Sequence, residues 1–361
     1  MARALELAAR GYGHTSPNPM VGAVVVKNGR VVAEGYHRRA GSDHAEIVAL
    51  KKAQKNGRKT VGATVYVNLE PCCHVGRTGP CTLALIKAGV KRVVYATTDP
   101  NPMVNGKGAR SLRQSGLEVK GGVLRKEARR LNEVYFGVYR TGRPFVTLKM
   151  AQSLDGRIAT VTGDSQWISG PPALKVVHQL RAGNDAILIG RGTLKADNPA
   201  LTVRNVKGKN PYRIVVTESG RLPGSCQFLD NNDDQRSIVA ISAEGVKRLA
   251  KRTRGKNLTY WTIKSSPTGG LDLADLLVRA GEFGLCSVLI EGGSGLATSF
   301  LKAQLVDKVV MVVAPIIIGR GTDTIGDLGI RKLSRNVGLD DVDIQQVGRD
   351  IVVRGYPNYR R

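Results

Sequence analysis

The sequence predicts an α/β protein that consists of two domains in tandem. The chain has 361 residues, which is enough for two domains that each bury a core. Short apolar segments alternate with segments of helical period in both halves, as in layered α/β folds. A Thr-Gly-Arg-Pro sequence at 141–144 interrupts this alternation, so we place the domains at residues 1–142 and 143–361.

The first domain is predicted to begin with an amphipathic helix over residues 1–10, followed by a β-hairpin. The hairpin follows from Asn28-Gly29, a two-residue turn that is favoured between alternating apolar strands. Helical periods and buried-strand patterns then alternate along the chain, so we expect helices packed on a mostly mixed sheet. The predicted strands are 21–26, 31–35, 64–69, 92–96 and 117–121, and the predicted helices are 44–55, 82–88 and 109–115.

The second domain is predicted to start with a strand over residues 145–150. Further strands follow with helical segments between most of them, and this pattern predicts a doubly wound, mostly parallel sheet. A run of asparagine and aspartate at 231–234 predicts a polar surface loop. The further predicted strands are 186–190, 212–216, 237–241, 258–261, 288–291 and 308–314.

The chain is strongly basic, with 55 Lys and Arg against 29 Asp and Glu and a net charge of +26. Such a charge indicates an anionic partner, either nucleic acid or phosphorylated small molecules. It also fits a basic surface that reflects the source organism. The basic residues are scattered and aromatic residues are few, so nucleic acid is the less favoured partner.

We expect neither a membrane span nor a secretion signal in this sequence. No run of about 18 apolar residues is present, so we expect no membrane span. Residues 1–10 are too short and too charged for a signal peptide. Of the five cysteines, three lie close together and Cys226 and Cys286 are isolated, which disfavours a disulfide framework. We expect a cytoplasmic protein, because reducing surroundings keep thiols free.

The most informative pattern in the chain is His44-Ala-Glu46 followed by Pro71-Cys72 and Cys81. One imidazole and two thiolates leave the fourth position of a tetrahedral zinc site open for water, as in catalytic sites. A carboxylate two residues after the histidine can carry the proton from that water to a leaving amine. Nucleobase deaminases share H-x-E and P-C-x-x-C. Here eight residues separate the two cysteines instead of two.

Cys73 and His74 leave an alternative open, because either could supply a fourth ligand and make the zinc site structural. Adjacent residues in a tight turn rarely both reach one metal. We therefore assign Cys72 as the ligand and expect His74 to face the substrate.

A second candidate site lies in the glycine-rich segment from Glu291 to Ser299. It follows the strand pattern at 288–290 and precedes a predicted helix at 296–303. Glycines and a helix N-terminus at the end of a strand form a phosphate cradle. No G-x-G-x-x-G sequence follows the first strand, so the usual Rossmann arrangement is excluded.

Together the two halves resemble the bifunctional deaminase/reductase family of riboflavin biosynthesis, over essentially the whole chain. The resemblance implies a cytidine-deaminase-like N-terminal domain and a dihydrofolate-reductase-like C-terminal domain. The motifs that carry it are Pro17-Asn18-Pro19-x-Val-Gly22, His44-Ala-Glu46, Leu69-Glu-Pro-Cys72-x-His74-x-Gly76-x-Thr78-x-Pro80-Cys81 and Asp99-Pro-Asn-Pro102 in the first half, and Ser153-Leu-Asp-Gly156, Ser165-x-Trp167-Ile, Asp197-x-Pro-Ala-Leu-x-Val-Arg204 and Glu291-Gly-Gly293 in the second.

The resemblance implies hydrolytic deamination of a diaminopyrimidinone that carries a ribosylamino phosphate, followed by reduction of its ribosyl chain to ribityl by NADPH. It puts one zinc on His44, Cys72 and Cys81, with Glu46 as the proton carrier. We also expect a homo-oligomer. The implied cofactor contacts are Ala151, Trp167, Thr193, Asp197, Gly293, Ser294, Gly295, Leu296, Ala297, Thr298 and Ser299, and the implied substrate contacts are Ser165, Arg181, Leu201, Arg204 and Glu291.

Two other functions compete with this interpretation. A nucleic acid deaminase with an appended domain fits the zinc motif and the charge, but not the long spacing between the cysteines or the second α/β half. The second competing function is that of a protein in which only the deaminase half is active. Lys149, Asp155, Asp197 and Glu291 favour an active reductase half.

Overall fold

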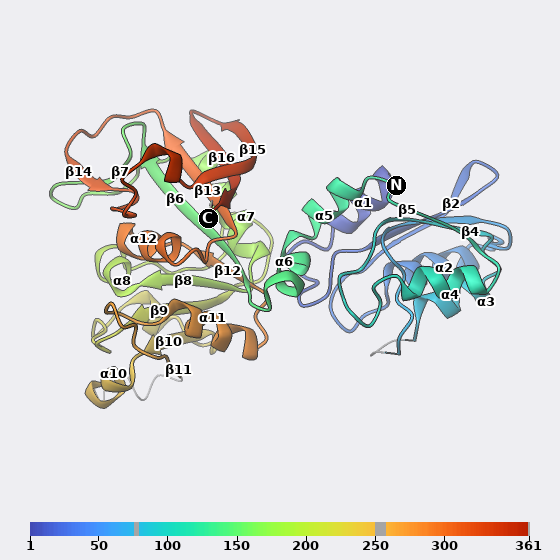
Figure 1. The fold of residues 1–361 in the computed structure, drawn as a ribbon, viewed down its shortest axis with the longest axis horizontal. Coiled ribbons are helices and arrows are strands. Elements are labelled where there is room, and N and C mark those ends of the chain that lie inside the picture. Colours follow the sequence, from blue (N-terminus) through green and yellow to red (C-terminus); the bar gives the residue numbers. More distant parts are fainter. Residues whose placement is uncertain (76–78, 250–257, 360–361) are drawn as a thin grey trace. The chain divides into compact units, whose positions relative to one another are not determined.

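The computed structural model describes residues 1–75, 79–249 and 258–359. The chain divides into two compact units, Met1–Gly142 and Arg143–Arg361 (Figure 1). The predicted motif positions Gly76 and Thr78 lie outside the described residues. Among the described helices, none is both long and apolar enough to cross a membrane.

The first unit contains a five-stranded sheet, which is mixed as predicted, and its strand order is β2-β1-β3-β4-β5. Strand β1 pairs antiparallel with β2 and β3, whereas β3, β4 and β5 run parallel. The turn between β1 and β2 has positive φ at both Asn28 and Gly29, the conformation that this residue pair favours. The strands are β1 Gly22–Lys27, β2 Arg30–Tyr36, β3 Thr64–Leu69, β4 Arg92–Thr97 and β5 Glu118–Gly121.

Helices cover both faces of this sheet, with α1 and α5 on one face and α2, α3 and α4 on the other (Figure 1). The predicted helices are present, but α5 and α6 were not predicted. The sequence of α5 is mostly charged, and Ala128 is its one buried residue, so it shows no apolar period. The helices are α1 Ala2–Ala9, α2 Ala45–Lys55, α3 Cys81–Lys87, α4 Lys107–Gln114, α5 Arg125–Leu131 and α6 Glu133–Thr141.

Small residues let two helices approach the sheet and the β3 loop very closely. Ala45, Ala49 and Ala53 form the fully buried stripe of α2. A Cβ atom on Gly35 of β2 would lie 2.4 Å from the Ala45 carbonyl oxygen, and one on Gly108 of α4 would lie 2.1 Å from that of Pro71. These contacts fix the N-terminus of α2 and the residue before Cys72.

The second unit contains a nine-stranded sheet, in the order β11-β10-β9-β8-β12-β6-β13-β16-β15. The strands from β11 to β13 run parallel, which confirms the mostly parallel sheet, while β16 and β15 add an antiparallel hairpin. These strands are β6 Phe145–Ser153, β8 Ala186–Gly190, β9 Tyr212–Thr217, β10 Ser237–Ile241, β11 Thr259–Thr262, β12 Ser287–Ile290, β13 Lys308–Ala314, β15 Gly338–Val347 and β16 Asp350–Asn358; β7 Arg157–Thr160 and β14 Gly321–Asp323 form a separate pair.

Both faces of the large sheet are covered, as the doubly wound prediction requires. Along β8, Ala186 and Leu188 pack with α11 and α12, whereas Ile187 and Ile189 pack with α8 and α9. The polar loop predicted at 231–234 is only partly correct, because Asn232 is buried. The helices are α7 Pro171–Gly183, α8 Arg191–Asp197, α9 Gln227–Asp230, α10 Ala243–Arg248, α11 Leu273–Glu282 and α12 Ser294–Lys302.

Candidate active sites

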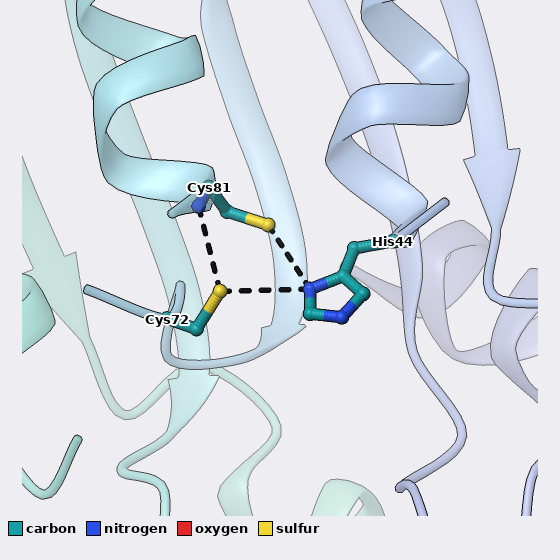
Figure 2. Close-up of side chains that lie close together, drawn as sticks. All are labelled: His44, Cys72 and Cys81. Carbon is teal, nitrogen blue, oxygen red and sulfur yellow. Dashed lines mark hydrogen bonds between the residues drawn. The ribbon is translucent and has the colours of Figure 1, made fainter. Parts of the chain in front are cut away.

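Three elements of the first unit bring His44, Cys72 and Cys81 together. His44 directly precedes α2, Cys81 is the first residue of α3, and Cys72 lies in the loop after β3. The Nδ1 atom of His44 lies 3.2 Å from the Cys81 sulfur and 3.5 Å from the Cys72 sulfur (Figure 2). A tetrahedral zinc ion bound to these atoms needs them roughly 3.5 Å apart, so the residues fit zinc.

The protonation of the two thiols also suits a metal site. A hydrogen bond with the Cys81 thiol and contact with His44 lower the pKa of Cys72 to about 4. The hydrogen bond with Cys72 and burial raise the pKa of Cys81. The pair therefore shares one proton. A divalent cation favours both thiolates and would displace that proton.

Cys73 does not take part in this cluster, since its sulfur faces the Met103 carbonyl oxygen at 3.7 Å. His74 borders the adjoining cavity, and its Nδ1 atom is buried without a hydrogen-bond partner in the described part of the chain. The geometry therefore favours Cys72 over its neighbours as the thiolate ligand, which was the prediction.

Glu46 lies in the first turn of α2, beside the zinc ligands. It is only 3% exposed, and burial raises the pKa of its carboxyl to about 7. The carboxyl contacts the Cys81 thiol and borders a cavity of about 440 Å³. A carboxyl held between the metal ligands and an open cavity can exchange a proton with a molecule bound there.

Another part of the wall of this cavity carries Asp99, Asn101, Tyr135 and Tyr139. The Tyr135 hydroxyl donates a hydrogen bond to Asp99 at 3.0 Å, and burial raises the pKa of Asp99 to about 6. Among the site residues proposed from sequence, none came from this wall. Asp99 and Asn101 stand in a motif that carried the resemblance, but Tyr135 and Tyr139 lie on α6, which was not predicted.

Glu70 holds the loop that carries Asp99. Its carboxylate accepts hydrogen bonds from the backbone N–H groups of Gly106 and Ala109, both at 2.9 Å, and of Asp99 at 3.3 Å. A buried carboxylate at the N-terminus of a helix is favourable, and here it fixes α4 beside the cavity.

In the second unit, the predicted phosphate cradle lies at the N-termini of α8 and α12. The Thr193 hydroxyl accepts a hydrogen bond from the Gly293 backbone N–H at 3.0 Å, which joins the two termini. The predicted turn through Ser299 is wrong, because α12 begins at Ser294. Ala297, Phe300 and Leu301 are buried at helical spacing, and their packing extends the helix toward the glycines.

The other predicted contacts of the cofactor, and the predicted substrate contact Leu201, differ in how accessible they are. Ala151 lies on β6, and Asp197 ends α8, where it forms a hydrogen bond with Ser165. Trp167 is 70% exposed. The Leu201 side chain is 1% exposed and packs in the core with Val215 and Phe228, so only its backbone could reach a ligand.

Arg181 is neither a free phosphate ligand nor an ordinary surface residue. Its guanidinium pairs with the Glu291 carboxylate through two hydrogen bonds of 2.7 and 2.8 Å, and both side chains are about nine-tenths buried. Glu291 also lies near Lys149, whose pKa burial lowers. Arg204, by contrast, is exposed, and its guanidinium donates to the Thr202 hydroxyl at 3.0 Å.

Comparison with known proteins finds a family match for each half of the chain. Residues 1–97 match the zinc-binding region of cytidine and deoxycytidylate deaminases, and residues 144–353 match the RibD C-terminal domain. The chain is 44% identical to the riboflavin biosynthesis protein RibD of Aquifex aeolicus, over 98% of this chain and 96% of that protein.

The chain belongs to the RibD family of riboflavin biosynthesis proteins.

Solved RibD structures share the fold of the whole chain. The deaminase/reductase of Thermotoga maritima is 38% identical with a TM-score of 0.88, and RibD of Acinetobacter baumannii is 35% identical with a TM-score of 0.86. Each alignment covers 99% of this chain and 97% of the other.

Membership in the RibD family confirms several predictions. The protein is a bifunctional deaminase and reductase, with a cytidine-deaminase-like domain followed by a dihydrofolate-reductase-like domain. Its zinc site consists of His44, Cys72 and Cys81, and the RibD reductase implies NAD(P)H. The competing interpretation as a nucleic acid deaminase with an appended domain is wrong, because the second half matches the RibD C-terminal domain.

The buried ion pair of the reductase half gives a stability prediction. Arg181→Met leaves the Glu291 carboxylate buried without its partner, so the free energy of unfolding of the second unit should fall by about 3–5 kcal/mol. Both tryptophans, Trp167 and Trp261, lie in this unit, and Trp261 is buried. Tryptophan fluorescence during denaturant unfolding therefore measures the second unit alone.

The matched control is Arg331→Met, which removes an exposed ion pair with Asp327. Exposed pairs contribute about 0–1 kcal/mol, so this variant should unfold like the wild type. If Arg181→Met lowered the free energy of unfolding no more than Arg331→Met does, Lys149 alone would be sufficient to compensate the buried Glu291 charge.

Proposed function

We propose that the two units catalyse consecutive steps on one phosphorylated pyrimidine. The first unit deaminates a diaminopyrimidinone that carries a ribosylamino phosphate, and the second reduces the ribosyl chain to ribityl with NADPH. The name of the Thermotoga maritima relative, a diaminohydroxyphosphoribosylaminopyrimidine deaminase and 5-amino-6-(5-phosphoribosylamino)uracil reductase, supports these substrates. The observation that carries the proposal is the cluster of His44, Cys72 and Cys81 with Glu46 at the edge of a cavity.

Product analysis tests this function directly. The purified chain is incubated with the diaminopyrimidinone ribosylamino phosphate, with and without NADPH. Without NADPH we expect ammonia and the deaminated ribosyl product, and with NADPH the ribityl product. Ammonia without any reduced product when NADPH is present would leave only the deaminase half active.

In the deaminase half, we assign proton transfer to Glu46. Zinc, when bound, supplies a polarised water near neutral pH. Glu46 moves both protons of the attacking water, one to the adjacent ring nitrogen and one to the departing amine, so that a C–N bond breaks, a C=O bond forms and ammonia leaves. Asp99 and Asn101 can accept and donate hydrogen bonds to polar groups on the pyrimidine, and Tyr135 orients Asp99.

In the reductase half, we assign the cofactor to the C-terminal edge of the sheet. NADPH, when bound, supplies the hydride. The backbone N–H groups at the start of α12, after Gly293, favour its pyrophosphate, and Thr193 holds Gly293 in place. Ala151, Trp167, Asp197 and the residues Ser294 to Ser299 remain the proposed further contacts.

The proposed substrate contacts of the reductase are Ser165, Arg204 and Glu291, with the Leu201 backbone beside them. Arg204 is the residue that we assign to the substrate phosphate, because it is exposed and its guanidinium makes no ion pair with any described carboxylate. Arg181 acts on the substrate through Glu291, whose carboxylate it orients.

Arg204→Ala should raise the KM of the reductase for its phosphorylated substrate by roughly ten- to a hundredfold. This is the effect of losing one charge-assisted phosphate contact of about 1.5–3 kcal/mol. The KM for NADPH should change little. Steady-state kinetics with pre-deaminated substrate measures both constants, and Arg331→Ala serves as a control for the loss of an exposed cation.

Two other outcomes would revise the assignment of the phosphates. If Arg204→Ala weakened NADPH and left substrate binding unchanged, Arg204 would bind the cofactor. If neither KM moved, Arg204 would be an ordinary surface arginine.

Compartment and assembly complete the proposal. Zinc binding requires Cys72 and Cys81 as free thiols, which a reducing cytoplasm maintains. The exposed apolar side chains Val342 and Ile344 on the outermost strand β15 support a homo-oligomer formed with a second copy of the chain. Sedimentation velocity at micromolar concentration tests the assembly, and a monomer would contradict it.

A further inference from the structure

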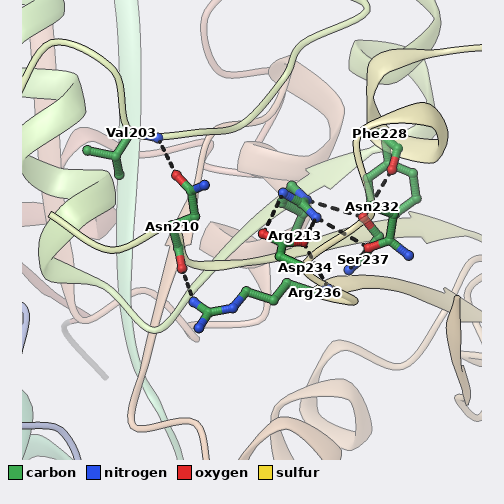
Figure 3. Close-up of polar contacts among 8 residues, drawn as sticks. All are labelled: Val203, Asn210, Arg213, Phe228, Asn232, Asp234, Arg236 and Ser237. Atoms are coloured by element: carbon green, nitrogen blue, oxygen red, sulfur yellow. Dashed lines mark hydrogen bonds and ion pairs between the residues drawn. The ribbon is translucent and has the colours of Figure 1, made fainter. Parts of the chain in front are cut away.

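The segment that carries Arg204 is held by side chains rather than by a helix or a strand. Each of three consecutive residues gives one backbone group to a side chain from another part of the chain. Arg181 donates to the Thr202 carbonyl oxygen at 3.1 Å. The Val203 N–H donates to Asn210 at 2.9 Å (Figure 3). The Arg204 N–H donates to the Nδ1 atom of His178 at 3.1 Å.

These supports are themselves fixed in the fold. His178 and Arg181 lie one turn apart on α7, and the His178 ring is 4% exposed. The Asn210 carbonyl oxygen accepts a hydrogen bond from Arg236 (Figure 3). The Arg236 guanidinium lies over the Tyr212 ring. The backbone at Arg204 thus has little freedom, although its side chain is exposed.

We infer that His178 is a positioning residue of the reductase site, which fixes the backbone of Arg204 and thereby directs its guanidinium toward the substrate phosphate. The inference rests on the proposed function, which assigns Arg204 to that phosphate. His178 itself touches no substrate. Its contribution depends on an unprotonated Nδ1 atom, because only that form accepts the Arg204 N–H.

The surroundings of His178 keep its ring neutral. Burial lowers the pKa of His178, and the positive charges of Arg181 on α7 and of Arg204 lower it further, against an opposing effect of Glu291 after β12. The lone pair of Nδ1 is therefore available at neutral pH, with the proton on Nε2. As the pH falls through the lowered pKa, Nδ1 gains a proton, the hydrogen bond is lost and substrate affinity falls.

Two substitutions separate the hydrogen bond from the packing of the ring. Asparagine can place its Oδ1 atom close to the position of Nδ1, whereas leucine fills similar space without an acceptor. With pre-deaminated phosphorylated substrate at pH 7, His178→Leu should raise KM roughly three- to tenfold, the effect of one lost hydrogen bond, with kcat nearly unchanged. His178→Asn should stay close to the wild type.

The pH profile distinguishes positioning from a merely structural role. Below neutral pH the wild-type KM should rise more steeply than that of His178→Asn, which has no proton to gain at this position. Protonation of the substrate phosphate affects both proteins equally, so the difference between them reports on His178. Equal acid dependence in the two proteins would overturn the inference, and this test remains valid if the leucine variant fails to fold.

A double-mutant cycle tests whether His178 acts through Arg204. In an Arg204→Ala background, His178→Leu should cause no further rise in KM, because the side chain that it positions is missing. The same rise in both backgrounds would overturn the inference and leave the phosphate assignment intact. If Arg204→Ala alone leaves KM unchanged, the phosphate assignment of the proposed function fails, and the inference fails with it.

Discussion

Cys81→Ser should remove zinc and deaminase activity together. A serine hydroxyl does not ionise near neutral pH and is a poor ligand for zinc, so the site keeps two of its three ligands. Without zinc the pKa of water stays near 15.7 instead of about 7, so ammonia release should fall by more than about a thousandfold. Elemental analysis of the purified protein should show a drop from about one zinc per chain to almost none.

Cys73→Ser is the matched control, because Cys73 neighbours the ligand Cys72 but faces the Met103 carbonyl oxygen. This variant should keep both zinc and activity. Full zinc occupancy in Cys81→Ser would contradict the ligand set. If Cys73→Ser lost its zinc at the same time, Cys73 would be the ligand. If Cys81→Ser and Cys73→Ser both kept their zinc, His74 would be the ligand.

Glu46→Gln should abolish most of the ammonia release while the protein keeps its zinc. Glutamine fills the same buried space but cannot carry a proton, and general acid–base catalysis contributes about 10²- to 10⁴-fold. Reduction of pre-deaminated substrate should stay near normal, because Glu46 belongs to the first of two compact units. Ammonia release, NADPH oxidation and zinc content are measured on the same preparation.

The converse variant is Arg204→Ala, which should impair reduction and leave deamination unchanged. A pair of variants that each lose a different activity would demonstrate two independent sites in one chain. If Glu46→Gln lost both activities to the same extent, the two sites would have to be coupled.

Strands buried on both faces could be located from sequence alone. β3, β10 and β13 have the predicted bounds, because parallel strands covered by helices carry few polar residues and so form apolar runs. The hairpin of β15 and β16 could not be found in this way. β15 contains Asp340, Asp341 and Asp343 and is mostly exposed, and a register shift between Asp340 and Asp343 disturbs its alternation.

The metal ligands could be predicted because their residue types and spacing are specific to one chemistry. The contacts that the other site residues make with one another could not be predicted from the sequence. Arg181 and Glu291 are 110 residues apart, and Tyr135 and Asp99 are 36 apart. No local pattern joins such pairs, since only the packing of α7 against the sheet, or of α6 beside the cavity, brings them into contact.

The close approach of α2 to Gly35, and of α4 to the carbonyl of Pro71, affects how natural variants of this chain should be interpreted. Neither Gly35 nor Gly108 is a zinc ligand, but neither position has space for even one methyl group. A side chain there would displace the start of α2 or the β3 loop, and with it His44 or Cys72. A sequence variant with every zinc ligand intact can therefore be a metal-deficient allele, and added zinc would not restore it.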